Sequence, residues 1–252
     1  MRILTPLQED LLSRERSLLN DLRLKLLGYD ASQEDVTSLG HSISQLDDLF
    51  LLVIVGEFNA GKSAFINALL GQKLLREGVT PTTSQINILR YGEKGAPSLV
   101  EEGHTLLLYP VELLSELSIV DTPGTNAVIR QHEELTTHFI PRADLVLFVT
   151  SADRPFTESE RVFMEQIRAW GKKVVIILNK TDLFQEKSEL EQVVEFVQQN
   201  AQVLLNSTPQ IFPVSSRLAL RAKMGEPQLW QDSGFEALET YIHNSLDQAE
   251  QV

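Results

Sequence analysis

Short runs of aliphatic residues alternate with helical stretches along the middle of this 252-residue chain. The clearest runs are LFLLVIV at residues 49–55, LVLFVTS at 145–151 and KVVIILN at 173–179. Continuous runs of Val, Ile and Leu suit strands that are covered on both faces, and the intervening helices supply the crossovers between parallel strands. The alternation therefore predicts an α/β fold with a doubly wound, mostly parallel sheet.

The charge balance and the lack of cysteine exclude several kinds of function. The chain has 22 Lys and Arg against 35 Asp and Glu, which gives a net charge of −13. This balance argues against a broad nucleic-acid interface and against a polybasic membrane surface. Without cysteine there is no disulfide and no thiolate chemistry. Glu9 and Asp10 argue against a signal peptide, and the longest apolar run is too short to span a bilayer. We therefore expect a cytosolic-type protein that binds no nucleic acid.

Apolar residues at helical spacing flank the central region on both sides. Thr5 and Pro6 form a helix start, and leucines then recur at seven-residue intervals up to Gly28. A second helix is expected over residues 32–48 and a third around 235–246. These helices either pack on the central domain or form a small helical bundle. We expect N-terminal helices over 1–48, a nucleotide-binding domain over 49–223, and a C-terminal helix over 224–252 that returns to the bundle.

The segment GEFNAGKS at residues 56–63 follows a predicted strand and opens a predicted helix. Its glycines allow tight turns that point successive backbone N–H groups at a phosphate, and the helix N-terminus adds partial positive charge. Lys62 would bridge the β- and γ-phosphates, and the Ser63 hydroxyl would bind Mg²⁺. A purely structural glycine turn is the alternative. The expected phosphate-binding residues are Gly56, Asn59, Ala60, Gly61, Lys62, Ser63 and Ala64.

A second motif, DTPG at residues 121–124, closes another predicted strand. Asp121 could hold Mg²⁺ through water, and the Gly124 N–H could reach the γ-phosphate. Upstream, VTPTTSQ contains Thr82 and Thr83, of which Thr83 is preferred. Its hydroxyl could bind Mg²⁺, and its carbonyl could accept a hydrogen bond from the attacking water. Capping of a turn is the alternative role for these threonines. The expected metal-binding residues are Ser63, Thr83 and Asp121.

The segment NKTD at residues 179–182 predicts which base is bound. It begins at the end of the strand KVVIILN, at the edge of the sheet where ligands of such folds bind. The Asp182 carboxylate can accept two hydrogen bonds from guanine, whereas adenine offers neither donor; such a site rejects the wrong base by roughly 10⁴–10⁵. Lys180 would lay its aliphatic stem along the base. Asn179 completes the motif, and a backbone N–H of Ser215 or Ser216 would reach guanine O6. The sequence predicts GTP and GDP as ligands.

The residues expected to assist hydrolysis are less complete than those expected to bind nucleotide. Ras-like enzymes orient the attacking water with a glutamine directly after D-x-x-G, where this chain has Thr125. Arg76 and Arg130 are near in sequence, but neither is at an arginine-finger position. We therefore expect slow intrinsic hydrolysis that is completed by a second domain or a partner. The candidate catalytic residues are Lys62, Ser63, Thr83, Asn59 and Gly124.

Five segments together resemble the G domain of dynamin-related proteins. They are VIVGEFNAGKSAFINALLG, GVTPTTSQINILRYG, IVDTPGTN, PRADLVLFVTSADRPFTESE and ILNKTDL. The chain is most similar to the bacterial dynamin-like and fuzzy-onions-like branch of cyanobacteria and plastids. The resemblance covers about residues 50–223, and the first four segments carry most of its specificity.

The resemblance implies a GTPase that remodels membranes by fusion or fission. It implies a homodimer of G domains that meet across the nucleotide, and flanking helices that form a neck. We expect this chain to be part of a longer protein, peripheral to membranes on the bacterial cytoplasmic or plastid stromal side, whose membrane contact comes from regions outside it. Dynamins carry a glutamine and a serine where this chain has Phe58 and Asn59. Phe58 cannot orient water, but Asn59 could donate its amide to the β–γ bridging oxygen.

Two alternatives belong to other classes of function. An Era-type ribosome-assembly GTPase shares PTT and DTPG, but those proteins carry a basic RNA-binding appendage and this chain is acidic. A GTP-dependent dimerisation switch that scarcely hydrolyses GTP is the other alternative.

Overall fold

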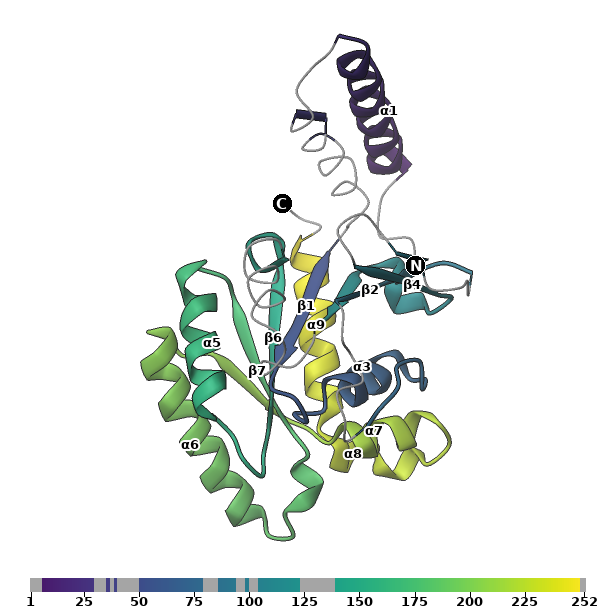
Figure 1. The fold of residues 1–252 in the computed structure, drawn as a ribbon. Coiled ribbons are helices and arrows are strands. Elements are labelled where there is room, and N and C mark those ends of the chain that lie inside the picture. The colour runs from purple at the N-terminus through teal and green to yellow at the C-terminus, as the bar shows by residue number, and fades with distance from the viewer. Residues whose placement is uncertain are drawn as a thin grey trace.

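A computed structural model describes residues 6–29, 35–36, 39, 50–78, 86–93, 98–99, 104–122 and 139–249. Its centre is one eight-stranded sheet with the strand order β3-β4-β2-β5-β1-β6-β7-β8 (Figure 1). Strands β5, β1, β6, β7 and β8 run parallel, β2 is antiparallel to β5, and β4 runs parallel to β2. The strands are β1 (Leu51–Gly56), β2 (Asn87–Tyr91), β3 (Ser98–Leu99), β4 (Thr105–Tyr109), β5 (Ser118–Asp121), β6 (Leu145–Ser151), β7 (Val174–Asn179) and β8 (Gln210–Pro213).

The sheet is covered by helices on both faces, which confirms the predicted doubly wound α/β fold. Helices α5 and α6 lie on one face, and α3, α7 and α9 lie on the other (Figure 1). The helices are α1 (Pro6–Gly28), α3 (Lys62–Leu70), α5 (Glu158–Ala169), α6 (Lys187–Leu205), α7 (Ser216–Lys223), α8 (Trp230–Ser233) and α9 (Phe235–Ala249), and the 3₁₀ turns are η1 (Glu112–Ser115), η3 (Ile140–Arg142), η4 (Thr181–Leu183) and η5 (Pro227–Leu229).

The central strands contribute side chains to two cores. In β1, Leu52 and Ile54 belong to the core beneath α3, whereas Val53 and Val55 belong to the core beneath α5 and α6. All six positions of β1 and all six of β7 are buried. This two-sided burial explains why these strands read as continuous aliphatic runs rather than as alternating patterns.

Helix α9 packs on the central α/β domain. Its residues Phe235, Leu238, Ile242 and Leu246 are all buried in the same core as β1 and α3. The apolar face of α9 therefore packs against the central domain. A bundle that α9 would share with residues 1–48, and the domain boundary at residue 223, stay predictions.

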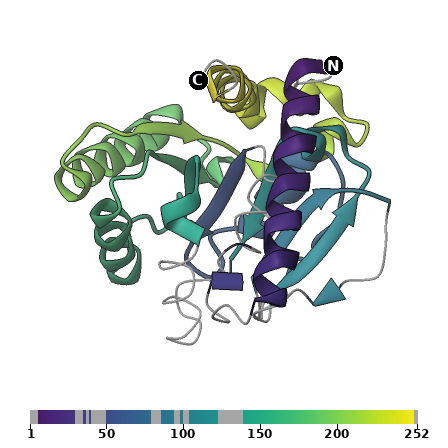
Figure 2. The ribbon, with the colours of Figure 1, turned by 90° about the horizontal axis from the view of Figure 1, so that it is seen from above.

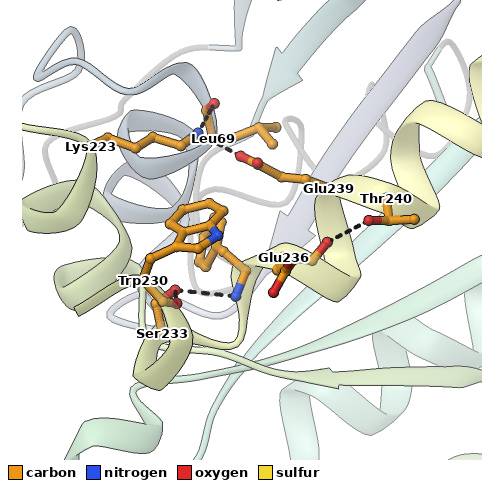
Figure 3. A network of polar contacts seen from close by, with 8 residues as sticks. Leu69, Lys223, Trp230, Ser233, Glu236, Glu239 and Thr240 are labelled. Carbon is orange, nitrogen blue, oxygen red and sulfur yellow. Dashed lines mark hydrogen bonds and ion pairs between the residues drawn. The ribbon is translucent and has the colours of Figure 1, made fainter. Parts of the chain in front are cut away.

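Lys223, the last residue of α7, ties three helices together (Figure 3). Its ammonium donates to the Leu69 carbonyl of α3 at 2.9 Å and pairs with the Glu239 carboxylate of α9 at 2.5 Å. The same ammonium lies 5.6 Å from the centre of the Trp230 ring, a distance that permits a cation–π contact. The C-terminal helix is thereby joined to the helix that follows the phosphate loop.

Helix α1 lies apart from the sheet in Figure 1, and in the view from above it lies in front of the strands (Figure 2). Leu11 and Leu18, two of its predicted apolar positions, are 66% and 68% exposed. Most of the helix expected over residues 32–48 lies outside the described residues. Within the part of the chain that the structure describes, no helix is both long and apolar enough to cross a membrane.

Candidate nucleotide-binding site

The phosphate loop leaves β1 at a position where only glycine fits. Gly56 has φ +146°, and a Cβ there would lie 2.0 Å from the Val149 carbonyl oxygen of β6. At the other end of the loop Gly61 has φ +91°, and a Cβ there would lie 2.4 Å from Nδ2 of Asn179. Asn59 takes the left-handed conformation between them, with φ +67°. The backbone is therefore wound tightly into the start of α3, as the motif predicts.

Lys62 opens α3 and folds back over its own loop. Its ammonium donates to the Gly56 carbonyl at 2.9 Å and to the Glu57 carbonyl at 3.1 Å. Burial lowers its pKa to about 8, an effect that the negative charges of Asp121, Glu160 and Glu57 partly oppose. A phosphate group would supply the additional negative charge that stabilises the protonated lysine.

A cavity of about 640 Å³ lies over this loop. Its size suits a small-molecule ligand. Of the predicted phosphate-binding and base-binding residues, Asn59, Ala60, Gly61, Lys62, Ser63, Ala64 and Lys180 line it. The cavity therefore extends from the predicted phosphate loop to Lys180, whereas the other predicted base-end residues, Asn179, Asp182, Ser215 and Ser216, are not among those that line it.

Asp121 and Thr122 end β5 close to the phosphate loop. Asp121 is buried, and its charge acts on Lys62. The Thr122 hydroxyl donates to the Ile54 carbonyl of β1 at 2.9 Å, which fixes the end of β5 against β1. The Ser63 hydroxyl and the Asp121 carboxylate are oxygen donors of the kind that Mg²⁺ prefers. The other predicted residues of this region, Thr83 and Gly124, lie outside the described residues.

Asn179 at the end of β7 connects the phosphate loop to the loop that follows β8. Its amide donates to the Ala60 carbonyl at 3.0 Å. Its Oδ1 accepts from the Ser216 hydroxyl at 2.8 Å and from the Ser216 backbone N–H at 3.1 Å. All of these groups are buried, so the arrangement holds the two loops in fixed relation.

Asp182, the predicted reader of guanine, lies in η4. The Ser215 hydroxyl donates to its Oδ1 at 2.5 Å, and the Arg217 guanidinium pairs with its Oδ2 at 2.6 Å. The backbone N–H of Ser215 donates to the Ser233 carbonyl at 2.8 Å. The N–H of Ser216 donates to Asn179. A hydrogen bond from the N–H of Ser215 or Ser216 to guanine O6 therefore stays a prediction, and it requires that N–H to release its present acceptor.

Lys180 is held at the base end by an unusual backbone and by an ion pair. It takes the left-handed conformation with φ +67°, and its ammonium lies 3.7 Å from the Asp153 carboxylate. The Ser151 hydroxyl donates to that carboxylate and, with Lys180, lowers the pKa of Asp153. Lys180 lines the cavity, and the sequence predicts that its stem contacts the base.

Several residues that the motifs did not single out also line the cavity. They come from the phosphate loop, the end of β6, the loop that follows it and the first turn of α5, and they are Glu57, Ser151, Asp153, Arg154 and Glu160. The residues TESE at 157–160 form a capping box at the start of α5, since Thr157 accepts from the Glu160 N–H while Glu160 accepts from the Thr157 N–H. The sequence pattern does not indicate that Glu160 also lines the cavity. Its place there depends on the strand order, which puts β6 beside β1.

Glu160 is a buried carboxyl that accepts two hydrogen bonds and feels the charge of a second carboxylate. Burial raises its pKa to about 7, against the hydrogen bonds from the Thr150 hydroxyl at 3.0 Å and from the Thr157 backbone. The charge of Glu57 raises the pKa further. Glu57 in turn accepts from the Ser159 hydroxyl at 3.1 Å, so the first turn of α5 is joined to the phosphate loop.

A tightly wound glycine loop between β1 and α3, with a lysine that folds back over it beside a cavity, defines a P-loop domain, and comparison with known proteins agrees. Residues 51–180 match the family model described as 50S ribosome-binding GTPase. The chain belongs to this GTPase family.

Within that class, the chain is similar to dynamin-like proteins and, at 29% identity over 63% of its length, also to the GTPase Era of Pseudomonas fluorescens. The chain is similar to a probable transmembrane GTPase, FZO-like, chloroplastic, of Arabidopsis thaliana, with 42% identity over 85% of this chain and 26% of the relative. It is also similar to the bacterial dynamin-like protein of Nostoc punctiforme, with 26% identity over 86% of this chain and 40% of the relative. The resemblance to the fuzzy-onions-like branch of the dynamin-related GTPases is thereby confirmed.

A solved structure shares the fold. It is described as an oligomerised bacterial dynamin pair, with a mechanism for the long-range sensing and tethering of membranes, and it matches with a TM-score of 0.68 and 21% identity. The match covers 94% of this chain and 43% of that one. The chain thus spans less than half the length of these relatives.

Proposed function

We propose that the chain binds GTP and GDP with Mg²⁺ and hydrolyses GTP as the nucleotide-dependent module of a dynamin-like membrane-remodelling protein. The observation that carries the proposal is the bridge made by Asn179. It joins the phosphate loop at Ala60 to the base-reading loop at Ser216, so one nucleotide can occupy both ends of a single site.

Binding divides between the two ends of the site. Lys62 and the loop N–H groups hold the phosphates, and Ser63 with Asp121, joined by Thr83, would hold Mg²⁺. The ion would neutralise charge on the β- and γ-phosphate oxygens. Asp182 would accept the N1–H and 2-amino donors of guanine, while Lys180 covers the base.

Hydrolysis requires charge stabilisation at the phosphates. Lys62 can stabilise negative charge on the transferring group, the Gly124 N–H would reach the γ-phosphate, and the Asn59 amide can donate to the β–γ bridging oxygen. Phe58 lines the same cavity but offers neither a donor nor an acceptor. We propose that a second G domain completes the site across the nucleotide, as a homodimer. Membrane contact would come from regions of a longer protein on its bacterial cytoplasmic or plastid stromal side.

The first experiment measures binding of fluorescent GDP and ADP to the purified chain, with and without Mg²⁺. We expect GDP to bind and ADP to bind at least 10³-fold more weakly, because adenine cannot pair with Asp182. Asp182→Asn should weaken GDP binding by a similar order while the protein stays folded by circular dichroism. Equal binding of both nucleotides would contradict the proposal.

A second experiment addresses pairing. Phosphate release per protein molecule is measured over a hundredfold range of protein concentration at saturating GTP. A rise in specific activity with concentration supports activation by a second G domain. A low rate that stays flat, with GTP-dependent dimers in sedimentation, would instead support the weakly hydrolysing switch.

The Era-type alternative predicts a different partner. Co-purification of ribosomal RNA that survives nuclease-free washing in high salt would support it. Its absence, together with nucleotide-dependent behaviour of the purified chain, is what the net charge of −13 leads us to expect.

A further inference from the structure

Both oxygens of the Asp182 carboxylate are engaged by groups of the protein itself. Ser215 donates to Oδ1, and Arg217 pairs with Oδ2 at 2.6 Å. The Asp182 side chain is only 9% exposed, whereas that of Arg217 is 67% exposed. The carboxylate is thus fixed in the protein, while its cationic partner lies in solvent and can rotate away.

The position of Arg217 in α7 is unfavourable apart from this ion pair. Arg217 is the second residue of the helix, and Ser215, two residues before it, caps the N-terminus by accepting from the Leu218 N–H. A positive side chain in the first turn is repelled by the partial positive charge of the helix end. The pair with Asp182 offsets that repulsion, so the two side chains neutralise each other.

Guanine bound to Asp182 and the Arg217 guanidinium would both approach the Oδ2 oxygen. The two guanine donors approach the carboxylate side by side, so one of them needs the Oδ2 that the guanidinium occupies. We propose that Arg217 is an exchangeable counter-ion of Asp182 that must leave before guanine binds, and that it thereby slows nucleotide association and lowers affinity. This inference rests on the proposed function, because it takes guanine as the ligand of Asp182.

The proposal predicts a change in the association rate of the nucleotide rather than in its dissociation rate. Once guanine is bound, Arg217 is displaced, so Arg217→Ala should leave the dissociation rate of fluorescent GDP unchanged. Its association rate should rise about two- to five-fold, the range expected when a partly exposed ion pair is removed. Arg217→Lys keeps the charge but loses the planar fork, so its association rate should lie between those of the wild type and the alanine variant.

A matched control lies on the same helix. Arg221 pairs with Glu226 on the exposed side of α7, and Arg221→Ala removes the same charge from the same helix without touching Asp182. It should leave both rate constants for GDP unchanged. Thermal unfolding of each variant checks that the fold is retained.

A double-mutant cycle tests whether Asp182 is the point of competition. Xanthine carries a carbonyl where guanine has its 2-amino group, so an Asp182→Asn variant can be assayed with fluorescent XDP. In that background there is no carboxylate for Arg217 to pair with, and the further change Arg217→Ala should alter XDP association less than about 1.5-fold.

The outcomes separate the two proposals. If the wild-type chain does not bind GDP in preference to ADP, the proposed function fails. If it does bind GDP but Arg217→Ala weakens binding, Arg217 contacts the bound nucleotide and the counter-ion proposal is overturned. Unchanged association in Arg217→Ala, or an equal gain in the Asp182→Asn background, would overturn it as well.

Discussion

Gly61 shows how closely the two halves of the site approach at a single residue. Replacing it by alanine would place a Cβ 2.4 Å from the Asn179 amide, at a φ of +91° that side chains rarely adopt. We expect Gly61→Ala to lower GDP affinity at least tenfold and to lower the free energy of unfolding by about 2 kcal/mol or more. Isothermal titration and urea unfolding measure the two effects.

The control for this variant is Gly171→Ala. Gly171 also has a positive φ, +64°, but nothing lies within 4 Å of the position that an added Cβ would take. The change should cost only backbone strain, on the order of 1 kcal/mol, with unchanged GDP affinity. Equal loss of affinity in both variants would show that strain rather than the clash with Asn179 is responsible.

At the residue scale, the sequence indicates candidate site residues that belong to contiguous motifs. Lys62 and Asp182 could be proposed because each motif follows a strand, and the structure places Lys62 at the cavity, whereas the role of Asp182 stays a prediction. Arg217 and Glu160 could not be assigned to the site in this way. Their roles depend on contacts with Asp182 and Lys62, which are distant in sequence and meet only because the parallel strands end at one edge of the sheet.

At the scale of elements, ionisation of Glu160 at the start of α5 makes the free energy of unfolding depend on pH. The Glu160 pKa is raised from an ordinary value of 4.5 to about 7. Between these values the folded state retains a proton that the unfolded state loses, so ionisation progressively destabilises the fold as pH rises to 7. Glu160→Gln preserves the capping box without a charge. We expect it to be more stable than the wild type at pH 8, by up to about 3 kcal/mol, with the difference shrinking towards pH 4.5.

Urea unfolding at several pH values measures this difference. Glu158→Gln changes an exposed carboxylate in the same turn of α5 and serves as the control, with a pH profile like that of the wild type. A Glu160→Gln variant whose advantage is the same at pH 4.5 and pH 8 would show that desolvation of the carboxylate is not the cause.

The junction of α3, α7 and α9 is held by Lys223 (Figure 3). Lys223→Ala leaves the Leu69 carbonyl and the Glu239 carboxylate without this donor and removes the contact with the Trp230 ring. We expect a loss of about 1–2 kcal/mol in the free energy of unfolding. Lys187→Ala, at the exposed start of α6, should change it by less than about 0.5 kcal/mol. Similar urea midpoints for the two variants would contradict the role of the junction.

The sequence predicted some elements better than others. The buried strands β1, β6 and β7 coincide with aliphatic runs, because both faces of each strand are covered. Strand β4 was not predicted; all its positions are half-buried, and its place beside β2 is set by pairing rather than by periodicity. For α9 the spacing of Phe235 to Leu246 predicts an apolar face but cannot indicate whether that face meets the sheet or a bundle.

At the scale of the whole molecule, helix α1 lies apart from the sheet (Figure 1). The described members of both hydrophobic cores begin at Phe50, and leucines of α1 are exposed. Deletion of residues 1–48 should therefore leave the fold intact, with GDP affinity within about twofold and a melting temperature within about 3 °C of the full chain. Calorimetry and nucleotide titration measure this. Aggregation of the shortened chain, or loss of GDP binding, would show that the first 48 residues stabilise the domain.

The hydrogen bonds of Asn179 to Ala60 and Ser216 have a consequence for ligand fragments. Because they preset the distance between the two ends of the site, a nucleotide acts as a bivalent ligand: after one end binds, the other meets its receptor at a high effective concentration. Guanosine and pyrophosphate added together should therefore fall far short of GDP. Asn179→Ala should therefore weaken the binding of GDP more than it weakens the binding of pyrophosphate.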